Sequence, residues 1–314
     1  MWALELKHEK LFDEEVLTAI CAIFQVNTQD ITDITVLKKG MTNRSFTFRC
    51  NGKRYIIRIS GAGTDKLIDR YQEKKVYETI RDMNICDQVI YINPEKGYKI
   101  TEFLENSRVC DPMNRLDVKR SMECLKKFHN KKFVVGHEFD LFEQIEKYEM
   151  LWRKSESVYE DYEKTKRDVY LLKSFIDDHI TEKVLTHIDA VPDNFLFVKD
   201  EQGIEEIRLI DWEYAGMQDP HVDIAMFGIY SLYDREQMDQ LIDAYFTEGC
   251  SRETRIKIYC YIAAGGLLWS NWCEYKEKLG ISFGEYATRQ YQYAKEYSRI
   301  AQLELREMEK TLHA

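Results

Sequence analysis

The side chains best suited to chemistry lie in one short segment, THIDAVPDNFLFV, which contains the pattern H-x-D-x-x-x-x-N at His187, Asp189 and Asn194. A phosphoryl-transfer site needs a carboxylate that accepts the proton of the attacking hydroxyl and, a few residues later, an oxygen ligand for magnesium. Asp189 and Asn194 fit these two roles. Farther along, the apolar run IRLI leads to Asp211, a second carboxylate that can coordinate the same metal. The pattern therefore favours phosphoryl transfer.

Each of these residues alone has an ordinary structural interpretation, because Asp caps helices and turns and Asn tolerates left-handed backbone. Their combination between two apolar strands, with an Asp closing the next strand, is what favours a functional site. His187 is interpreted as a structural residue that fixes the backbone of the loop.

Two common nucleotide-binding motifs are absent from the sequence. It contains no G-x-x-x-x-G-K-[ST], and Gly61 and Gly63 lack the third glycine of a dinucleotide fingerprint. The segment KKGMTNRSFTF offers another way to hold phosphates. Gly40 lies between two predicted strands there, and the backbone with Thr42 and Asn43 would cover the phosphates as a hairpin tip. Gly and Asn are also common in ordinary β-turns, so this signal is weak by itself.

The elements that must position these residues change in kind along the chain. The first hundred residues contain β-branched and aromatic runs separated by Gly and Asn turns, which predict an antiparallel sheet. A segment without Gly or Pro, residues 65–83, has helical spacing and interrupts that sheet. The predicted strands are ITDITVLKK, SFTFRC, KRYIIRIS, VIYI and GYKITEFL.

From about Asp111 the pattern predicts long amphipathic helices. Three short runs, VLTH, FLFV and EIRLID, are predicted to form one small sheet among them. The break between Glu105 and Pro112 predicts a nucleotide-binding unit with its hinge over residues 1–105 and a catalytic, substrate-binding unit over 106–314. The expected fold is α+β, a small antiparallel-sheet lobe followed by a large helical lobe. The expected helices are 114–130, 139–152, 156–180, 221–247, 251–278 and 283–311.

Composition narrows the classes of function. Fifty-five Asp and Glu against 45 Lys and Arg give a net charge of -10, which disfavours nucleic acid as a partner. No run of eighteen apolar residues exists and the start is charged, so we expect no membrane segment and a cytoplasmic location. The eight cysteines include no C-x-x-C pair, which disfavours a zinc knuckle or a disulfide framework.

The sequence resembles the choline and ethanolamine kinases, and bacterial choline kinases in particular. The likeness runs over roughly residues 31–300. H-x-D-x-x-x-x-N and I-D-W-E-Y are typical of the wider group that includes the aminoglycoside phosphotransferases, whereas MTN and LLWS indicate the choline branch. The resemblance implies a two-lobe protein-kinase-like fold that uses ATP and Mg²⁺. The segments that carry the likeness are GMTNRSF, YIIRISG, THIDAVPDN, LIDWEYAGMQDPHVDIA, GGLLWSNW and FGEYA.

The resemblance also implies roles for individual residues. Asp189 is similar to the catalytic base of the family, and Asn194 and Asp211 to its magnesium ligands, in agreement with the interpretation from spacing. Arg58 stands where choline kinases have a phosphate-contacting arginine, although a solvated charge at a sheet edge is an equally simple interpretation. The acidic partner of this arginine is expected on the next helix, with Glu73 preferred over Glu78. In the hinge segment ITEFLEN, backbone groups of Glu102 and Leu104 would hold the adenine.

Aromatic residues near the end of the chain predict a site for a small cation. Trp269 and Trp272 share a helix face, and Phe283 and Tyr286 repeat their spacing across the turn at residues 279–280, so the two pairs would converge. Tyr230 is assigned to the same substrate site. A box of ring faces binds quaternary ammonium, although core packing accounts for most aromatic residues in such helices.

Charge along the chain also favours a cationic amino alcohol, with choline preferred and ethanolamine as the alternative. Eight acidic residues and one basic residue lie between Asp211 and Asp243, which would attract a cationic substrate and magnesium. Glu213, close to Asp211, is the candidate for the charged contact, whereas the later acidic residues have the ordinary interpretation of a solvated helix face.

Two features leave alternatives open. Choline kinases often carry W-x-x-W ending in LWS, but Gly266 occupies the position three before Trp269. The residues 190–193 also replace a more polar filler. The alternatives are a related kinase acting on an aminoglycoside, thiamine or a sugar, and a catalytically inactive nucleotide-binding module. The expected oligomeric state is a monomer or a homodimer.

Overall fold

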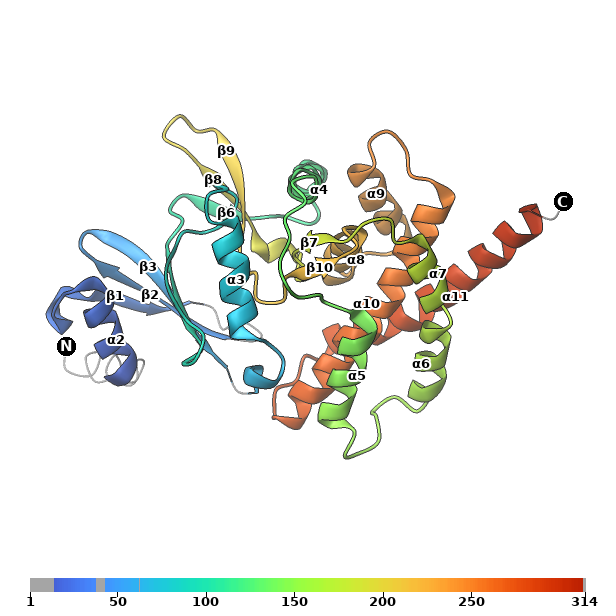
Figure 1. Ribbon diagram of the computed structural model, residues 1–314, viewed down its shortest axis with the longest axis horizontal. Coiled ribbons are helices and arrows are strands. Elements are labelled where there is room, and N and C mark those ends of the chain that lie inside the picture. Colours follow the sequence, from blue (N-terminus) through green and yellow to red (C-terminus); the bar gives the residue numbers. More distant parts are fainter. Residues whose placement is uncertain (1–13, 38–42, 62, 313–314) are drawn as a thin grey trace. The chain divides into compact units, whose positions relative to one another are not determined.

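The computed structural model describes residues 14–37, 43–61 and 63–312. It divides into two compact units, one ending at Ser107 and the other beginning at Arg108 (Figure 1). The predicted boundary between residues 105 and 106 lies two residues before this division. The N-terminal and C-terminal units are described in turn.

The N-terminal unit is built on one antiparallel sheet with the strand order β1-β2-β3-β5-β4. Strands β2 and β3 are joined by Asn51 and Gly52, both with positive φ (50° and 76°). An Asn-Gly pair is the favoured two-residue hairpin turn because both residues tolerate left-handed backbone. The strands are β1 (Thr32–Val36), β2 (Asn43–Cys50), β3 (Lys53–Ser60), β4 (Val89–Asn93) and β5 (Tyr98–Glu102).

The two faces of this sheet differ because side chains alternate along a strand. One face buries Phe46, Phe48 and Ile57 against α2 (Glu14–Phe24), an element that the sequence analysis did not anticipate. On the central strands β3 and β5, the opposite face carries Arg58 and its cross-strand neighbour Lys99. Helix α3 (Arg70–Ile80) supplies the acidic partner of both cations and lies within the predicted helix. Two short 3₁₀ turns, Thr28–Asp30 and Thr64–Lys66, complete the unit.

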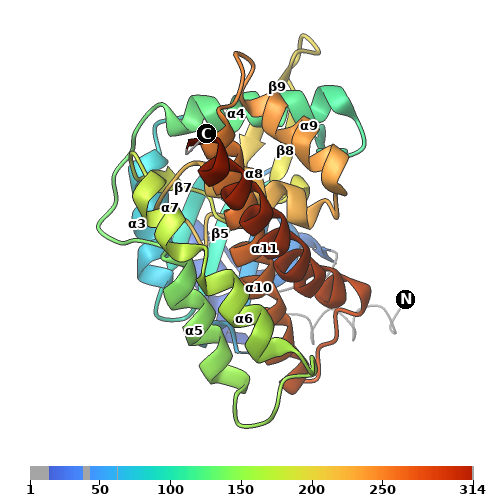
Figure 2. The ribbon, with the colours of Figure 1, turned by 90° about the vertical axis from the view of Figure 1, so that its right-hand side faces the viewer.

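Helices dominate the C-terminal unit, and α10 forms its centre. Most of the residues of this long helix are buried, and it packs against α5, α8 and α11. Figure 2 shows α11 running alongside α10. The helices are α4 (Arg115–His129), α5 (Leu141–Trp152), α6 (Tyr162–Tyr170), α7 (Lys173–His179), α8 (His221–Tyr230), α9 (Arg235–Tyr245), α10 (Arg252–Lys278) and α11 (Glu285–Leu312).

Two predicted helices are each divided in the structure. The predicted helix 221–247 is interrupted after α8, where Leu232 has a positive φ of 56°. Asp234 then caps α9 and exchanges hydrogen bonds with Gln237 in a capping box, which stabilises a new helix start. The predicted helix 156–180 is likewise divided into α6 and α7, with a turn at residues 171–172.

The small strands of the C-terminal unit form two sheets, so the prediction of a single sheet is wrong. Strand β7 (Val184–Thr186) pairs with β10 (Gly216–Gln218), a strand that the sequence analysis missed. Strands β8 (Phe195–Lys199) and β9 (Glu205–Leu209) form a hairpin that joins β6 (Ser107–Val109) instead. The chain turns between β7 and β8 through a 3₁₀ turn, Pro192–Asn194, which separates the two sheets.

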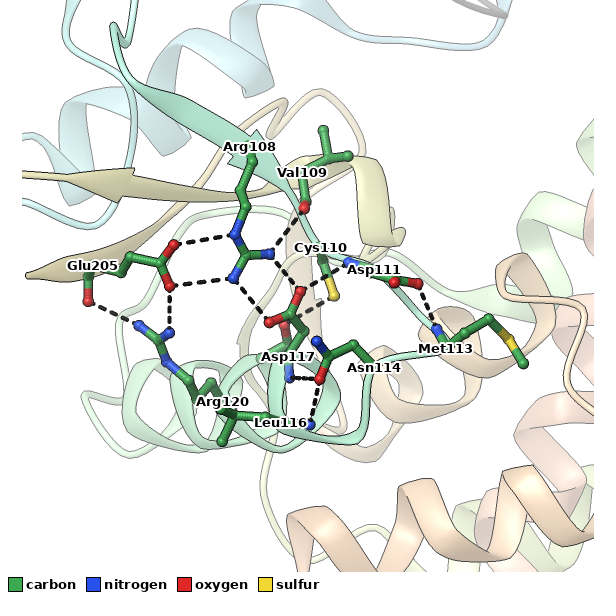
Figure 3. Close-up of polar contacts among 11 residues, drawn as sticks. Arg108, Val109, Cys110, Asp111, Met113, Asn114, Leu116, Asp117, Arg120 and Glu205 are labelled. Carbon is green, nitrogen blue, oxygen red and sulfur yellow. Dashed lines mark hydrogen bonds and ion pairs between the residues drawn. The ribbon is translucent and has the colours of Figure 1, made fainter. Parts of the chain in front are cut away.

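An ion-pair network fastens the β8–β9 hairpin to β6 and α4 (Figure 3). Arg108 of β6 pairs with Asp117 of α4 at 2.5 Å and with Glu205 of β9 at 3.1 Å. Arg120 of α4 pairs with the same glutamate at 2.8 Å. Both guanidinium groups also lie over the ring of Phe197 in β8. The two predicted magnesium ligands flank this hairpin, so the network helps to fix their spacing.

Among the described residues, no helix combines the length and apolar character needed to cross a bilayer.

Candidate active site

The loop between β7 and β8 carries Asp189 and is anchored by Asp223, in the first turn of α8. The backbone N–H groups of Ile188 and His187 donate to the two oxygens of Asp223 at 2.7 and 2.9 Å. His129 contacts the same carboxylate through Nε2 at 2.9 Å. Ile188 has a φ of 67°, a strained conformation for a β-branched residue, and these hydrogen bonds hold it there. The sequence analysis counted Asp223 only as part of an acidic stretch. Its position in an apolar, buried helix was the available signal.

Asn194 connects Asp189 to the segment that carries Asp211. Its side-chain Nδ2 donates to the Asp189 carbonyl at 2.9 Å and to Asp189 Oδ2 at 3.2 Å. Its own carbonyl accepts from the N–H of Ile210 at 2.9 Å, directly before Asp211. His187 Nε2 lies 2.9 Å from the Ile210 carbonyl, in agreement with a role in fixing the backbone. The structure thus gathers the three oxygen-bearing residues predicted from the H-x-D-x-x-x-x-N segment and the next strand.

Electrostatics in this cluster favour a bound cation. Burial raises the pKa of Asp189 to about 8, and the charges of Asp211 and Glu213 contribute to the rise. Hydrogen bonds from the side chains of Tyr230 and Asn194 partly offset this rise. Carboxylates that repel one another bind a hard cation well, and an amide oxygen with a carboxylate is a usual protein contribution to a magnesium site. Asn194 and Asp211 therefore fit Mg²⁺ by their donor chemistry.

Within the N-terminal unit, Glu73 joins three cations on the sheet face opposite the core. It is paired with Arg58, with Arg70 at 2.9 Å and with Lys99 at 3.1 Å. The alternative acidic partner, Glu78, pairs with Lys75 instead. Burial by itself would raise the pKa of Glu73, but the three positive charges outweigh it and hold the pKa far below its ordinary value.

Lys99 was not identified from the sequence, although it stands directly across from Arg58 in the β3–β5 register. Its ammonium also donates to the hydroxyl of Tyr77 at 2.6 Å. Asn43, at the start of β2, is buried and accepts from Arg70 at 3.1 Å. Thr42 and Gly40 lie outside the described residues. The cluster fixes Arg58 in place and carries more positive than negative charge.

The two predicted hinge residues lie at the end of β5 and just after it. The Glu102 N–H donates to the Gln88 carbonyl at 2.9 Å, and its carboxylate pairs with Lys53 at 2.7 Å. The Leu104 carbonyl accepts from the Ser107 hydroxyl at 2.7 Å. The Glu102 carbonyl and the Leu104 N–H are therefore the backbone groups to consider for a purine, which needs one acceptor and one donor.

Five rings from three parts of the C-terminal unit form a closed aromatic cluster, Tyr230, Trp269, Trp272, Phe283 and Tyr286. Consecutive ring centroids around this cluster are 4.9–6.4 Å apart: Trp269–Tyr230 5.8 Å, Tyr230–Tyr286 5.5 Å, Tyr286–Phe283 6.4 Å, Phe283–Trp272 4.9 Å and Trp272–Trp269 6.2 Å. The two tryptophans are buried and the other three residues are partly exposed. The structure brings together all the ring residues proposed from the spacing.

The carboxylate charge of Asp189 acts on two tyrosines of the aromatic cluster. Burial raises the pKa of Tyr230 and Tyr286, and the charge of Asp189 adds to the rise in both. Two further tyrosines that the sequence analysis missed, Tyr148 and Tyr214, have pKa values raised by burial and by the charges of Glu213 and Asp189. The Tyr214 ring also packs edge-on against Trp269, with centroids 5.4 Å apart.

Most of the acidic stretch from Asp211 to Asp243 has partners elsewhere. Asp219 pairs with Lys257 at 2.6 Å, and Asp239 and Asp243 pair with Arg255. Glu236 accepts from Gln240, Asp234 caps α9 and Asp223 anchors the Asp189 loop. The negative charge of the stretch is thus largely used locally, and the members that act on Asp189 are Asp211 and Glu213.

Comparisons with known proteins show which family the chain resembles. A sequence model of the choline/ethanolamine kinase family matches residues 34–295. Protein LicA of Haemophilus influenzae is 26% identical over 264 residues, or 80% of this chain and 75% of that protein. The crystal structure of choline kinase LicA from Streptococcus pneumoniae superposes with a TM-score of 0.77 at 29% identity, covering 91% of this chain and 98% of that one. A structure of LicA in complex with AMP gives a TM-score of 0.76 at 29% identity, covering 92% and 98%.

The likeness covers both the sheet unit and the helical unit, which together make the expected α+β, two-lobe kinase-like fold. The chain belongs to the choline/ethanolamine kinase family and is a phosphotransferase that acts on an alcohol group.

Proposed function

We propose that the chain transfers the γ-phosphoryl group of ATP, bound with Mg²⁺, to the hydroxyl of choline. The observation that carries the proposal is the position of Tyr230. Its ring belongs to the aromatic cluster, and the charge of Asp189 acts on its hydroxyl. A small molecule with a cation at one end and a hydroxyl at the other would reach both groups at once.

Asp189 is the proposed base. It would accept the hydroxyl proton as the substrate oxygen forms its bond to the γ-phosphorus and the bond from that phosphorus to the ADP oxygen breaks. Asn194 orients the carboxylate through its hydrogen bond to Oδ2. Asn194 and Asp211 would hold Mg²⁺, whose charge stabilises the phosphate oxygens when it is bound.

Nucleotide binding is proposed for the cationic face of the N-terminal unit. Arg58, held by Glu73, would contact a phosphate. Thr42 and Asn43, which follow Gly40 in the sequence, would contribute to covering the phosphates. The backbone carbonyl of Glu102 and the N–H of Leu104 would bind the adenine edge. The AMP found in a LicA structure 29% identical to this chain supports an adenine nucleotide.

The aromatic cluster is the proposed site for the ammonium end. A trimethylammonium group has no N–H to donate, so ring faces suit it better than a set of hydrogen-bond acceptors would, and each close ring contributes on the order of 0.5–2 kcal/mol. Glu213, buried beside Asp189, supplies the opposite charge. Ethanolamine shares the hydroxyl and the charge but needs acceptors for three N–H groups, so we expect choline to be preferred.

A coupled assay of ADP release with Asp189→Asn tests the proposal. Wild-type protein with ATP and Mg²⁺ is expected to release ADP when choline is added, more slowly with ethanolamine, and not with an aminoglycoside, thiamine or a sugar. Asp189→Asn keeps the shape of the side chain but removes the base, so kcat is expected to fall at least about a hundredfold.

The matched control for this variant is Asp193→Asn, a neighbour in the same loop whose side chain is exposed. It is expected to keep kcat within about twofold. Turnover with an aminoglycoside, thiamine or a sugar in place of choline would establish the related-kinase alternative. ADP release that no acceptor stimulates would establish the inactive nucleotide-binding module, and an Asp189→Asn variant of full activity would remove this residue from the mechanism.

A further inference from the structure

We infer that Gly266 is a positioning residue for the aromatic cluster. By letting the backbones of α10 and α11 approach closely, it sets the distance between the rings of these two helices and so the affinity of the site for the ammonium end of the substrate. The inference rests on the proposed function, which it extends from the rings to the residue that spaces them.

The close approach at Gly266 is between backbones. A Cβ atom placed on this residue would lie 2.6 Å from the Gln290 carbonyl oxygen, 2.8 Å from the Ala294 nitrogen and 2.9 Å from the Tyr293 Cβ, whereas ordinary contacts begin near 3.4 Å. Backbone atoms have no rotamer to change, so any side chain here must push α11 away. Helix propensity favours alanine over glycine inside a helix, which leaves this contact as the reason for glycine.

The stretch of α11 that faces Gly266 is also tied to α8. The side chain of Gln290, fully buried, donates from Nε2 to the Ile229 carbonyl at 3.0 Å. The hydroxyl of Tyr293 donates to the Tyr233 carbonyl at 2.6 Å. Ile229 directly precedes Tyr230, a member of the aromatic cluster. A displacement of α11 at Gly266 would therefore act on α8 as well as on α10.

Two ring contacts join the α11 side of the aromatic cluster to the rest. Phe283, just before α11, lies 4.9 Å from Trp272 of α10, and Tyr286, in the first turn of α11, lies 5.5 Å from Tyr230 of α8. Tyr286 is about one helical turn before Gln290, so a shift there is transmitted to its ring. The attraction between a cation and ring faces weakens as the rings separate, which makes ammonium affinity the sensitive property.

Gly265 provides a matched control because it is adjacent in the same helix but contacts only side chains. A Cβ atom there would meet the Ile229 Cδ1 at 3.1 Å and the Met226 Cε and Sδ at 3.3 Å. These are the far ends of side chains, whose small shifts need not displace α11, and Met226 Sδ also accepts from Trp269 Nε1 at 3.1 Å. Gly265→Ala thus makes the same chemical change in α10 without displacing a backbone.

The experiment measures steady-state kinetics of wild type, Gly266→Ala and Gly265→Ala, with choline and ATP each varied in turn. Gly266→Ala is expected to raise the KM for choline about fivefold to tenfold, while kcat and the KM for ATP stay within about twofold. Gly265→Ala is expected to keep all three parameters within about twofold. Isothermal titration with tetramethylammonium, a cation that cannot react, is expected to show the same loss of affinity in Gly266→Ala.

A second variant, Gln290→Ala, tests the same inference if Gly266→Ala does not fold. It removes the tie between α11 and α8 without a backbone clash, and it is expected to raise the KM for choline in the same direction. An unchanged KM for choline and unchanged tetramethylammonium affinity in the folded variants would overturn the inference. A parallel loss of kcat and of ATP binding would overturn it as well, because it would mark a general structural effect. If wild type phosphorylates no amine, the proposed function fails, and the tetramethylammonium titration still decides the role of Gly266.

Discussion

Asp223 shows how a residue that does not contact the substrate can control one that would. Its two oxygens accept from two consecutive backbone N–H groups, those of His187 and Ile188, and His129 Nε2 lies 2.9 Å from one of these oxygens. Both backbone partners are donors, so the site requires two acceptor oxygens in these positions. As a result, the loop is held with Ile188 in left-handed backbone. This conformation turns the next residue, Asp189, toward its partners.

Replacing Asp223 by Asn is expected to lower both stability and turnover. One amide NH₂ would face the donors that the carboxylate now accepts, and a buried group left without its partner costs about 1–3 kcal/mol. We expect the free energy of unfolding in urea to fall by that amount. We also expect kcat to fall while the KM for ATP changes little, because the Asp189 loop and the nucleotide-binding candidates belong to different units. Unchanged unfolding and unchanged kcat would show that the loop holds its shape without Asp223.

Residue types in a short pattern could be recognised from the sequence, whereas residues defined by their surroundings could not. Asp189, Asn194 and Asp211 stand close together along the chain and do share one cluster. Lys99 and Tyr148 belong to sites only because the fold brings distant segments together: one through the pairing of β3 with β5, the other through α5. No local pattern in the sequence marks such residues.

At the scale of elements, capping signals were more informative than length. The sequence Asp234 to Gln237 has the D-x-x-Q spacing of a capping box, and the structure starts α9 there, within a predicted single helix. The pairing of β7 with β10 had no comparable signal, because strands of three residues carry too little alternation to set a partner. Long periodic helices such as α10 and α11 were predicted with nearly their observed bounds.

The network around Arg108 is expected to make the β8–β9 hairpin sensitive to acid. The hydrogen bond from Arg108 holds the pKa of Asp117 below its ordinary value, and Arg108 and Arg120 do the same for Glu205. Groups with a lowered pKa stabilise the fold above their ordinary pKa, near 4, and lose that contribution as the pH falls through the lowered value. The free energy of unfolding should therefore decline below about pH 4, as the contribution of these ion pairs is lost.

Asp117→Asn tests this expectation. The Asp117 side chain is almost fully buried but Arg108 is 44% exposed, so the variant should lose only about 1 kcal/mol of unfolding free energy at pH 7. The difference from wild type should shrink as the pH falls below about 4 and through the lowered pKa of Asp117 in the folded protein, where the carboxyl becomes protonated. Glu182→Gln, which breaks the exposed pair with Lys132, is the control and should change stability by less than about 0.5 kcal/mol. A difference that is constant with pH would contradict the electrostatic explanation.

Over the whole molecule, the two candidate clusters carry opposite charge although the chain as a whole is acidic. The cluster of the N-terminal unit sets Arg58, Arg70 and Lys99 against Glu73, which leaves an excess of positive charge for phosphates. The cluster of the C-terminal unit sets Asp189 beside two further carboxylates, Asp211 and Glu213, a grouping that would suit a metal and an ammonium group. A net charge of -10 describes neither cluster, so local charge is the better guide to ligands.

Cysteine thiols report on packing in both units. Cys50 lies in the core of the sheet unit, and Cys260 is fully buried in α10. Cys124 of α4 is partly exposed, yet burial of its thiol raises the pKa to about 11. Burial raises the pKa of Cys260 to about 12. Reactivity toward alkylating reagents depends on the thiolate, so these values predict slow labelling even where a reagent can reach the sulfur.

Native protein at pH 7.5 is expected to react with iodoacetamide at Cys124 about a hundredfold more slowly than the unfolded chain, and at Cys260 at least about a thousandfold more slowly, from ionisation alone. Peptide mapping by mass spectrometry at timed intervals measures each rate, with protein in guanidinium chloride as the reference. Raising the pH should accelerate the labelling of Cys124 in the folded protein, because its thiolate fraction grows about tenfold for each pH unit. The labelling of Cys260 should stay slow, because it is limited by access of the reagent to the core. Rapid labelling of Cys124 at pH 7.5 would mean that α4 opens in solution, which would also release Asp117 and the ion-pair network that holds the β8–β9 hairpin.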